Sequence, residues 1–276
     1  MMRDGKHQYV GGQPARQPGA SHLPGVSKLS GPAARLAATM GPRVSALFFP
    51  RRCPLCGEML EYGDDAGICR ACRSSLPLVR PPRCLRCSRT VTDPAEAFCA
   101  DCREKEKHFR YGLALFDYDD RMQRAVTQIK YHNQRSFADP LAAMMAEKLG
   151  DEIRAMGAEC LVPVPVHPAR RKKRGFNQAE LLAEGLGRRI GIPVRTDLLF
   201  RGRNTEAQKA LTTEERFRNL LGAFHADPAA AAGVRSAILV DDIYTTGSTI
   251  EACATALQRA GVREVYFVSL CIVPEE

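Results

Sequence analysis

Eight of the eleven cysteines in this chain fall between residues 53 and 102, in four Cys-x-x-Cys pairs. The pairs are Cys53 and Cys56, Cys69 and Cys72, Cys84 and Cys87, and Cys99 and Cys102. Two thiolates at this spacing bind one side of a metal ion, and two such pairs complete a tetrahedral zinc site. The pattern predicts two structural Zn²⁺ sites. Spacing alone leaves open whether the pairs combine sequentially within each half or in a cross-braced arrangement.

The second half of this cysteine module repeats the first half. The offset from Cys53 to Cys84 is 31 residues, and the gaps between successive pairs are 12 and 11 residues. Residues 45–110 hold too few apolar residues to build a core without metal, so we expect a double zinc ribbon there. The other cysteines, Cys160, Cys253 and Cys271, have apolar neighbours and are expected to be core residues.

A second set of residues that could do chemistry follows the apolar run 237–240. It comprises Asp241, Asp242, Thr245, Thr246, Gly247, Ser248 and Thr249. In a parallel sheet, ligands bind beyond the carboxyl ends of the strands, and the amino end of the helix that follows attracts phosphate. The hydroxyls add donors, and a glycine lets the backbone approach the ligand.

The two carboxylates of this set need a different role, because they would repel a phosphate. They suit the hydroxyls of a ribose and a Mg²⁺ ion that bridges those hydroxyls to a pyrophosphate. The alternative is that Asp241 and Asp242 only cap a turn and that the hydroxyls are solvated. The whole string after a buried-type strand favours the ligand site.

The remaining pattern alternates short apolar runs with amphipathic stretches. Strands are predicted over 111–118, 160–166, 237–240 and 265–273, and helices over 122–131, 138–156, 178–190 and 249–260. This alternation predicts an α/β fold with a parallel sheet covered by helices on both faces. Between them, residues 169–175 are expected to form a loop. Its five consecutive cations, from Arg170 to Arg174, either meet an anion or form a solvated charge run.

Composition sets the outer limits of the prediction. Hydrophobic residues make up 45% of the chain and no apolar run is long enough to cross a membrane, so we expect a cytoplasmic protein without membrane insertion. Residues 1–39 are expected to be a disordered extension, and either Met1 or Met40 could start translation. This extension carries part of the net charge of +9, and two tetrathiolate zinc sites would remove about 4 charges more. Overall charge is therefore weak evidence for a nucleic-acid partner.

These motifs carry a resemblance. The segment 240–249 resembles the ribose-phosphate signature of type I phosphoribosyltransferases. The segments Pro163–Pro165, Arg174–Gln178 and Arg201–Leu211, together with Tyr118 and Lys130-Tyr131, are similar to the ComF family of competence-associated proteins. The resemblance covers residues 45–273 and implies a phosphoribosyltransferase-type domain over 111–276.

The resemblance also implies a ligand and partners. The ligand would be phosphoribosyl pyrophosphate with Mg²⁺, its pyrophosphate near Arg174 and Gly175, under a flap at 201–224 that contributes Arg203 and Gln208. A role in DNA uptake and natural transformation is implied, with single-stranded DNA or DNA-uptake proteins as partners.

Two other functions stay open from the residues alone. One is a salvage or biosynthetic phosphoribosyltransferase that acts on a base or an amine. The other is a non-catalytic DNA-binding or regulatory protein, because arginines are interleaved with the paired cysteines and could contact phosphates. A scaffolding role for the module is equally compatible. No residue stands out as a general base, and the acceptor cannot be read from the sequence.

Overall fold

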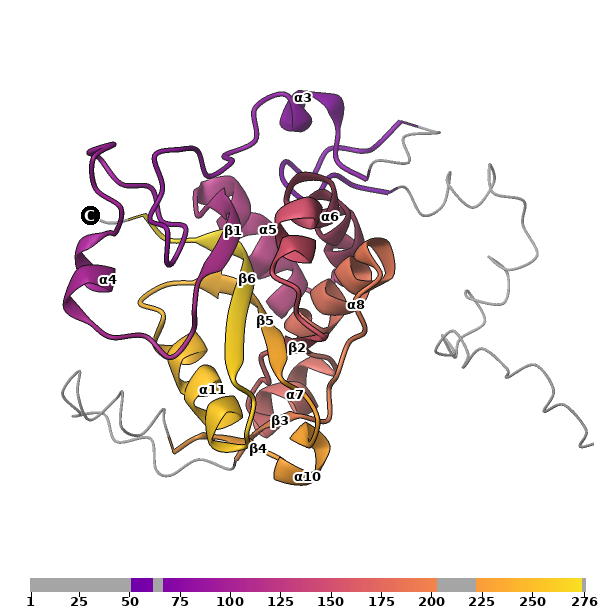
Figure 1. Cartoon of the computed structure of the whole chain (residues 1–276). Coiled ribbons are helices and arrows are strands. Elements are labelled where there is room, and N and C mark those ends of the chain that lie inside the picture. The colour runs from indigo at the N-terminus through magenta and orange to yellow at the C-terminus, as the bar shows by residue number, and fades with distance from the viewer. Residues whose placement is uncertain (1–50, 62–66, 203–221, 275–276) are drawn as a thin grey trace, which may run out of the picture. The chain divides into compact units, whose positions relative to one another are not determined.

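A computed structural model of the chain describes residues 51–61, 67–202 and 222–274 (Figure 1). The predicted extension at residues 1–39 and the predicted ligand residues Arg203 and Gln208 lie outside these ranges. Residues 49–276 belong to one compact unit. The predicted fold class is confirmed: a parallel sheet carries helices on both faces and follows a cysteine module.

The sheet has four parallel strands in the order β1-β6-β5-β2. Their bounds are β1 Gly112–Asp117, β2 Cys160–Pro163, β5 Ser236–Tyr244 and β6 Glu264–Ile272. The two central strands are buried along almost their whole length. Such strands carry near-continuous apolar runs because helices cover both faces.

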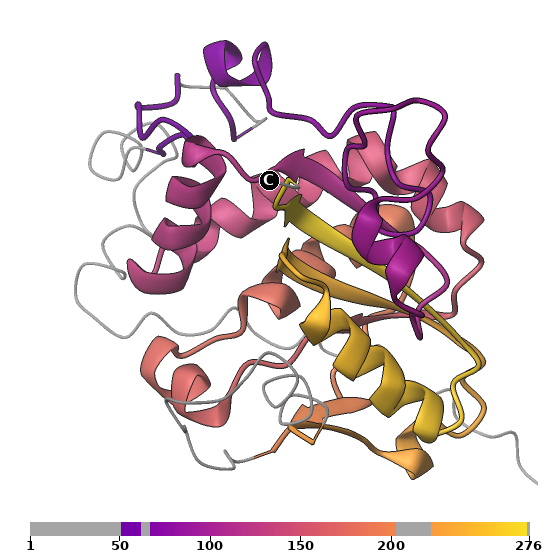
Figure 2. The same cartoon turned by 90° about the vertical axis from the view of Figure 1, so that its left-hand side faces the viewer.

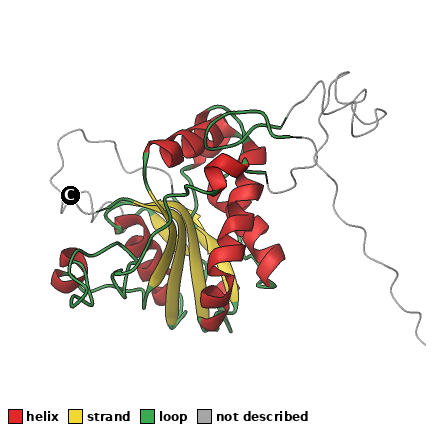
Figure 3. Ribbon diagram, turned by 90° about the horizontal axis from the view of Figure 1, so that it is seen from above, coloured by secondary structure: helices red, strands yellow, loops and turns green. Residues whose placement is uncertain are grey.

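Three helices cover one face of the sheet, namely α5 Asp120–Tyr131, α6 Ala138–Ala155 and α8 Gln178–Ile190. The other face carries α11 Ser248–Arg259 and the second half of the cysteine module. Figure 2 looks onto α11 where it lies across this face, and Figure 3 shows helices on both sides of the strands. β2 pairs with β5 in parallel, with Pro163 opposite Val240, so the carboxyl end of β2 lies beside the second half of β5.

The helices begin and end where local chemistry dictates. In α8, Asn177 caps the first turn by accepting a hydrogen bond from the backbone N–H of Ala179 at 3.1 Å. The helix ends before Gly191, whose φ of 76° suits a residue without a Cβ. Asp119 caps α5 in the same way through the N–H groups of Arg121 and Met122.

The prediction that the third strand ends at Val240 is wrong. β5 continues to Tyr244 because β6 runs alongside it, with Tyr244 opposite Ile272. Pairing with β6 therefore includes the backbone of the two aspartates. Asp241 and Asp242 lie within the strand and not in the loop that follows it. Strand alternation sends their side chains to opposite faces of the sheet.

The loop predicted at 169–175 is also wrong, because residues 168–174 form a short helix, α7 Pro168–Arg174. Proline at the first helical position is pre-organised for this start, and the His167 side chain accepts from the N–H of Ala169 at 3.2 Å. The helix stops at Gly175, which has a φ of 81°. A helix spreads the five cations around its axis, so they do not all point the same way.

The remaining described elements are short. β3 Leu199–Arg201 and β4 Phe224–Ala226 form an antiparallel pair, and α10 Pro228–Ala231 leads into β5. A one-turn helix, η1 Arg135–Phe137, joins α5 to α6. Most of the expected flap at 201–224 lies outside the described residues. Among the residues that the structure describes, no helix is long and apolar enough to span a membrane.

Candidate ligand site and metal centres

The eight paired cysteines form two four-sulfur clusters. The first holds Cys53, Cys56, Cys69 and Cys72, and the second holds Cys84, Cys87, Cys99 and Cys102. Within each cluster all sulfurs lie within 4.8 Å of one another. The pairs therefore combine sequentially, and the cross-braced alternative is excluded.

The sulfur separations fit zinc. Zn–S bonds of ~2.3 Å in a tetrahedron place the sulfurs ~3.8 Å apart. The Cys56 and Cys69 sulfurs are 3.7 Å apart, and those of Cys87 and Cys99 are 3.6 Å apart. The clusters therefore suit two structural zinc ions. By contrast, Cys160, Cys253 and Cys271 are buried in the core, and burial raises the pKa of the Cys160 thiol to about 11.

The two cysteine clusters pack on opposite faces of the sheet. Residues of the first cluster share an apolar core with α5, α6 and α8, whereas residues of the second share one with β6 and α11. Short helices α3 Arg70–Arg73 and α4 Ala100–Glu104 each carry the last cysteine of a cluster. The module is thus packed against the sheet.

The arginines of the module are largely engaged within the protein. Arg73 and Arg83 form ion pairs with Glu147 and Glu152 of α6. Arg86 lies over the ring of Phe98, at 5.1 Å from its centroid. Arg70 and Arg80 are exposed. These contacts favour a bracing role for most of the arginines considered for nucleic-acid binding.

The acidic pair of β5 is buried. Asp241 and Asp242 are only 8% and 5% exposed. Burial raises the pKa of Asp241 well above its usual range, and the neighbouring charge of Asp242 raises it further. Asp241 lies on the α11 side of the sheet, near Cys253. Asp242 lies on the side of α5 and α8.

A chain of polar contacts holds Asp242. It forms an ion pair with Lys130 of α5, and it accepts a hydrogen bond from Gln178 Nε2 at 3.2 Å. Gln178 in turn accepts a hydrogen bond from Arg174 of α7. Asn177 ties the same region to the strand end by donating to the carbonyl of Val164 at 2.9 Å. Four elements, α5, β5, α8 and α7, thus meet at one point.

A small cavity of about 150 Å³ lies where these four elements meet. It is lined by both aspartates, by cations of three elements and by the segment that follows β2. The lining residues are Lys130, Tyr131, Val164, Pro165, Val166, Arg170, Arg174, Gln178, Arg201, Asp241, Asp242 and Thr249. The structure therefore brings the predicted residues Asp241, Asp242, Thr249 and Arg174 together.

Two arginines of different elements, Arg170 and Arg201, both line this cavity. The charge of Arg170 helps to lower the pKa of Arg201, although burial is the larger cause. Arg201 is held over the ring of Phe224, 5.1 Å from its centroid. A ligand with several negative charges would stabilise two cations that line the same cavity.

The predicted phosphate loop spans Thr245–Gly247, between β5 and α11. Gly247 has a φ of 75°, and a Cβ there would lie 2.2 Å from the hydroxyl of Tyr244. Thr245 and Thr246 are exposed, and the hydroxyls of Thr246 and Ser248 are 2.9 Å apart. The loop therefore presents hydroxyls at the amino end of a twelve-residue helix.

Four cavity residues with cationic or amide side chains were absent from the predicted site: Lys130, Arg170, Gln178 and Arg201. Lys130, Gln178 and Arg201 stood in segments that carried the family resemblance, so that signal could have found them. Arg170 belonged to the cationic run that the sequence could not divide into inward and outward residues. Arg171 of the same run points elsewhere and forms an ion pair with Glu180.

The sequence of this chain is similar to a known domain family and to several known proteins. A family model described as a double zinc ribbon domain matches residues 44–105. Competence protein ComFC of Bacillus subtilis is 30% identical over 207 residues, covering 71% of this chain and 80% of that protein. The chain belongs to the ComF family. Two further relatives are 29% identical: Competence protein F of Haemophilus influenzae and the DNA utilization protein YhgH of Escherichia coli K12.

The match to these ComF relatives extends over both parts of the chain. It covers 79% of this chain and 95% of the Haemophilus protein, and 82% and 98% for YhgH. The solved allosteric regulatory enzyme of purine biosynthesis overlaps 49% of this chain and 25% of its own, at 23% identity and a TM-score of 0.33. That likeness is too weak to carry an argument.

Proposed function

We propose that this ComF protein binds phosphoribosyl pyrophosphate together with Mg²⁺ at the carboxyl ends of β5 and β2. The observation that carries the proposal is the placement of Asp241 and Asp242 on opposite faces of the sheet, at one cavity lined by cations. Two buried carboxylates amid cations suit a ligand with a neutral diol and strongly anionic ends. A phosphorylated ribose has both.

The parts of the ligand follow from the chemistry of the walls. The ribose hydroxyls lie at Asp241 and Asp242, and the 5-phosphate lies on the loop Thr245–Gly247 and the amino end of α11. The pyrophosphate lies toward Arg170 and Arg201, whose positive charges it balances. Mg²⁺ prefers carboxylate and phosphate oxygens, and these aspartates are the carboxylates that line the cavity.

This ligand permits one group transfer. A nitrogen lone pair forms a bond to the anomeric carbon, the bond from that carbon to the pyrophosphate oxygen breaks, and pyrophosphate leaves with the bonding electrons. The nitrogen loses its proton to solvent or a base. The described residues would contribute by positioning the sugar and by stabilising charge on the leaving group.

We further propose a role in DNA uptake, because the relatives named Competence protein F and ComFC cover both parts of the chain. If the protein binds the ligand but does not release pyrophosphate, it would act in DNA uptake as a regulator. If it releases pyrophosphate in the presence of an amine or base, it is an enzyme. An acceptor screen for pyrophosphate release separates the two.

The direct test of ligand binding is a calorimetric titration with phosphoribosyl pyrophosphate, with and without Mg²⁺. We expect Mg²⁺-dependent binding, and weaker binding of ribose 5-phosphate or pyrophosphate alone, because each fills only part of the site. Absence of binding with Mg²⁺ present, by protein that carries its zinc, would overturn the proposal.

A further inference from the structure

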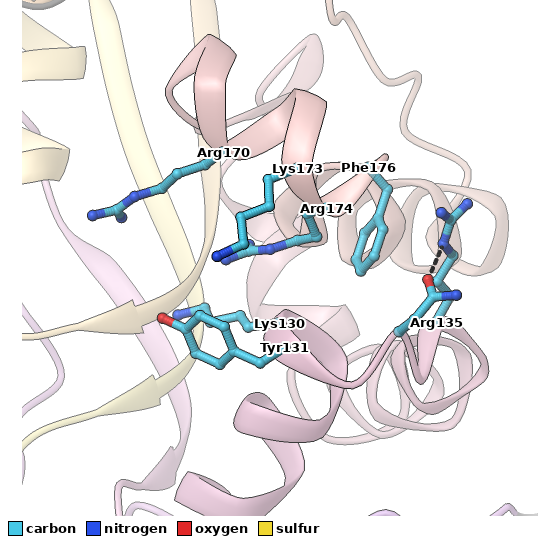
Figure 4. Close-up of a pocket in the computed structure, with 8 residues that line it drawn as sticks. Lys130, Tyr131, Arg135, Arg170, Lys173, Arg174 and Phe176 are labelled. Atoms are coloured by element: carbon cyan, nitrogen blue, oxygen red, sulfur yellow. Dashed lines mark hydrogen bonds between the residues drawn. The ribbon is translucent and has the colours of Figure 1, made fainter.

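A larger cavity of about 500 Å³ lies next to the small one, between α5 and α7 (Figure 4). The two share four lining residues, Lys130, Tyr131, Arg170 and Arg174. The large cavity is also lined by Asn133, Arg135, Lys173 and Phe176, which do not line the small one. Its volume lies within the ~300–1,000 Å³ range of sites that hold a whole small molecule.

The walls of the large cavity are strongly positive. Lys130, Arg135, Arg170, Lys173 and Arg174 line it, and none of its described lining residues is Asp or Glu. Arginines elsewhere in the described chain meet acids, such as Arg189 with Asp139 and Arg195 with Asp197. Of the five, Lys130 pairs with Asp242. The other four have no acidic partner among the described residues, so they repel one another, and an anion between them removes that cost.

Arg135 is fixed in place at one end of this cavity. Its Nε donates to the side-chain oxygen of Asn133 at 2.9 Å, and its guanidinium lies over the ring of Phe176, 4.6 Å from the centroid. Asn133 has a φ of 57°, in the left-handed region. Gly175 leaves room for the guanidinium, since a Cβ there would lie 2.9 Å from Arg135 Nη2. A guanidinium held this way is pre-organised to bind an oxyanion.

The ends of the cavity are distinct. Figure 4 shows Arg170 at the end near the sheet and Arg135 at the opposite end, with Lys173, Arg174 and Tyr131 between them and the ring of Phe176 next to Arg135. If the pyrophosphate lies toward Arg170 and Arg201, then Arg135 and Lys173 remain without an anionic partner from that ligand. Tyr131 is 72% exposed and offers a flat face beside these cations.

We propose that the large cavity binds the acceptor, and that this acceptor carries its own anionic group, a carboxylate or a phosphate, on a flat ring. Arg135 and Lys173 bind the anion and Tyr131 contacts the ring, on the opposite side of the ribose from Arg201. This inference rests on the proposed function. If the acceptor must carry an anionic group, neutral free bases are poor acceptors for this protein.

The test uses a pair of probes that differ in charge but hardly in shape, pyridine-3-carboxylate and pyridine-3-carboxamide. Their affinities are measured by ligand-observed NMR on full-length, zinc-loaded protein saturated with phosphoribosyl pyrophosphate and Mg²⁺. We expect the carboxylate to bind at least about tenfold more tightly than the amide, since charge-assisted hydrogen bonds are the stronger ones. Arg135→Gln and Lys173→Gln should each remove most of that preference.

Three outcomes would overturn the inference. The first is equal affinity for both probes in the wild type. The second is a loss of phosphoribosyl pyrophosphate affinity in Arg135→Gln as large as the loss of probe affinity, which would assign the cavity to that ligand. The third is oligonucleotide binding at Arg135 that strengthens with chain length, which would assign it to nucleic acid.

The control variant is Arg171→Gln, on the same helix but paired with Glu180 outside the cavity. It should keep the probe preference. If wild-type protein binds no phosphoribosyl pyrophosphate, the proposed function fails. The probe preference and its loss in Arg135→Gln can still be measured on the unliganded protein, so the two failures are distinguishable.

Discussion

Arg89, which follows the third cysteine pair of the module by two residues, donates a 2.6 Å hydrogen bond to the backbone carbonyl of Thr245 in the loop after β5. It also donates to the carbonyl of Val273, just after β6, at 3.1 Å. One partly buried guanidinium thus joins the second cysteine cluster to the loop proposed to bind phosphate. The cluster holds a loop of the ligand site in position.

Arg89→Ala should therefore weaken phosphoribosyl pyrophosphate binding several-fold without removing zinc. Two carbonyls lose charged donors, and a lost hydrogen bond of this kind costs about 1.5–3 kcal/mol of stability. Calorimetry and zinc analysis measure the two effects. Arg86→Ala is the matched control, because Arg86 donates to the carbonyl of Cys102 and does not reach the loop. Equal affinities for the two variants would show that Arg89 does not position the loop.

Zinc content should be about two ions per chain. Cys56→Ser and Cys84→Ser should each lower it by about one, because the clusters are separate and each needs four ligands. Only Cys84→Ser should also weaken ligand binding, because the second cluster holds the segment that carries Arg89, and Arg89 contacts the loop after β5. Elemental analysis and calorimetry on the same samples provide the measurement. Zinc-free native protein, or affinity loss in Cys56→Ser alone, would contradict this account.

Much of this arrangement could be predicted from the sequence. The bounds of α8 agree with the prediction, because apolar spacing and Asn177 define its start and Gly191 its end. The pairing of the cysteine clusters follows the repeat. The periodic segments also predicted the parallel sheet and which strand precedes the site.

Two parts could not be predicted, because they depend on contacts between distant segments. The continuation of β5 through Asp241 and Asp242 comes from its pairing with β6, whereas adjacent charges are typical of a strand end. The ion pair of Asp242 with Lys130 joins residues 112 positions apart. In the cationic run, the family resemblance singled out Arg174, but the sequence could not separate Arg170, which lines the cavity, from Arg171.

Gly247→Ala should destabilise the protein and weaken ligand binding. A Cβ would lie 2.2 Å from the Tyr244 hydroxyl, and the φ of 75° is strained for alanine, so we expect a loss of at least about 1–3 kcal/mol. Gly233→Ala is the control that separates backbone strain from a steric clash. Its φ of 85° is also in the left-handed region, but an added Cβ would have no neighbour within 4 Å. Thermal melts and calorimetry should show the smaller loss, and normal binding, for Gly233→Ala. Similar results for both variants would disprove the close contact.

Asp241→Asn should make the protein more stable at neutral pH. The folded pKa of Asp241 is raised above its unfolded value by burial, so folding favours the protonated form. The stability that this group contributes is present at acidic pH and is lost as the pH rises toward the folded pKa. Denaturant unfolding between pH 4 and pH 8 should show a shallower decline for Asp241→Asn than for the wild type. Parallel curves would contradict the burial argument.

The central claim is that Asp241 and Asp242 hold the ribose of the ligand, and titration of Asp241→Asn/Asp242→Asn with phosphoribosyl pyrophosphate and Mg²⁺ tests it most directly. Each lost charge-assisted hydrogen bond is worth about 1.5–3 kcal/mol, so the account predicts at least a hundredfold weaker binding. Zinc content should not change. Glu180→Gln is the control, since it removes a carboxylate that pairs with Arg171 outside the cavity, and its affinity should match the wild type. Wild-type affinity in the double variant would contradict the claim.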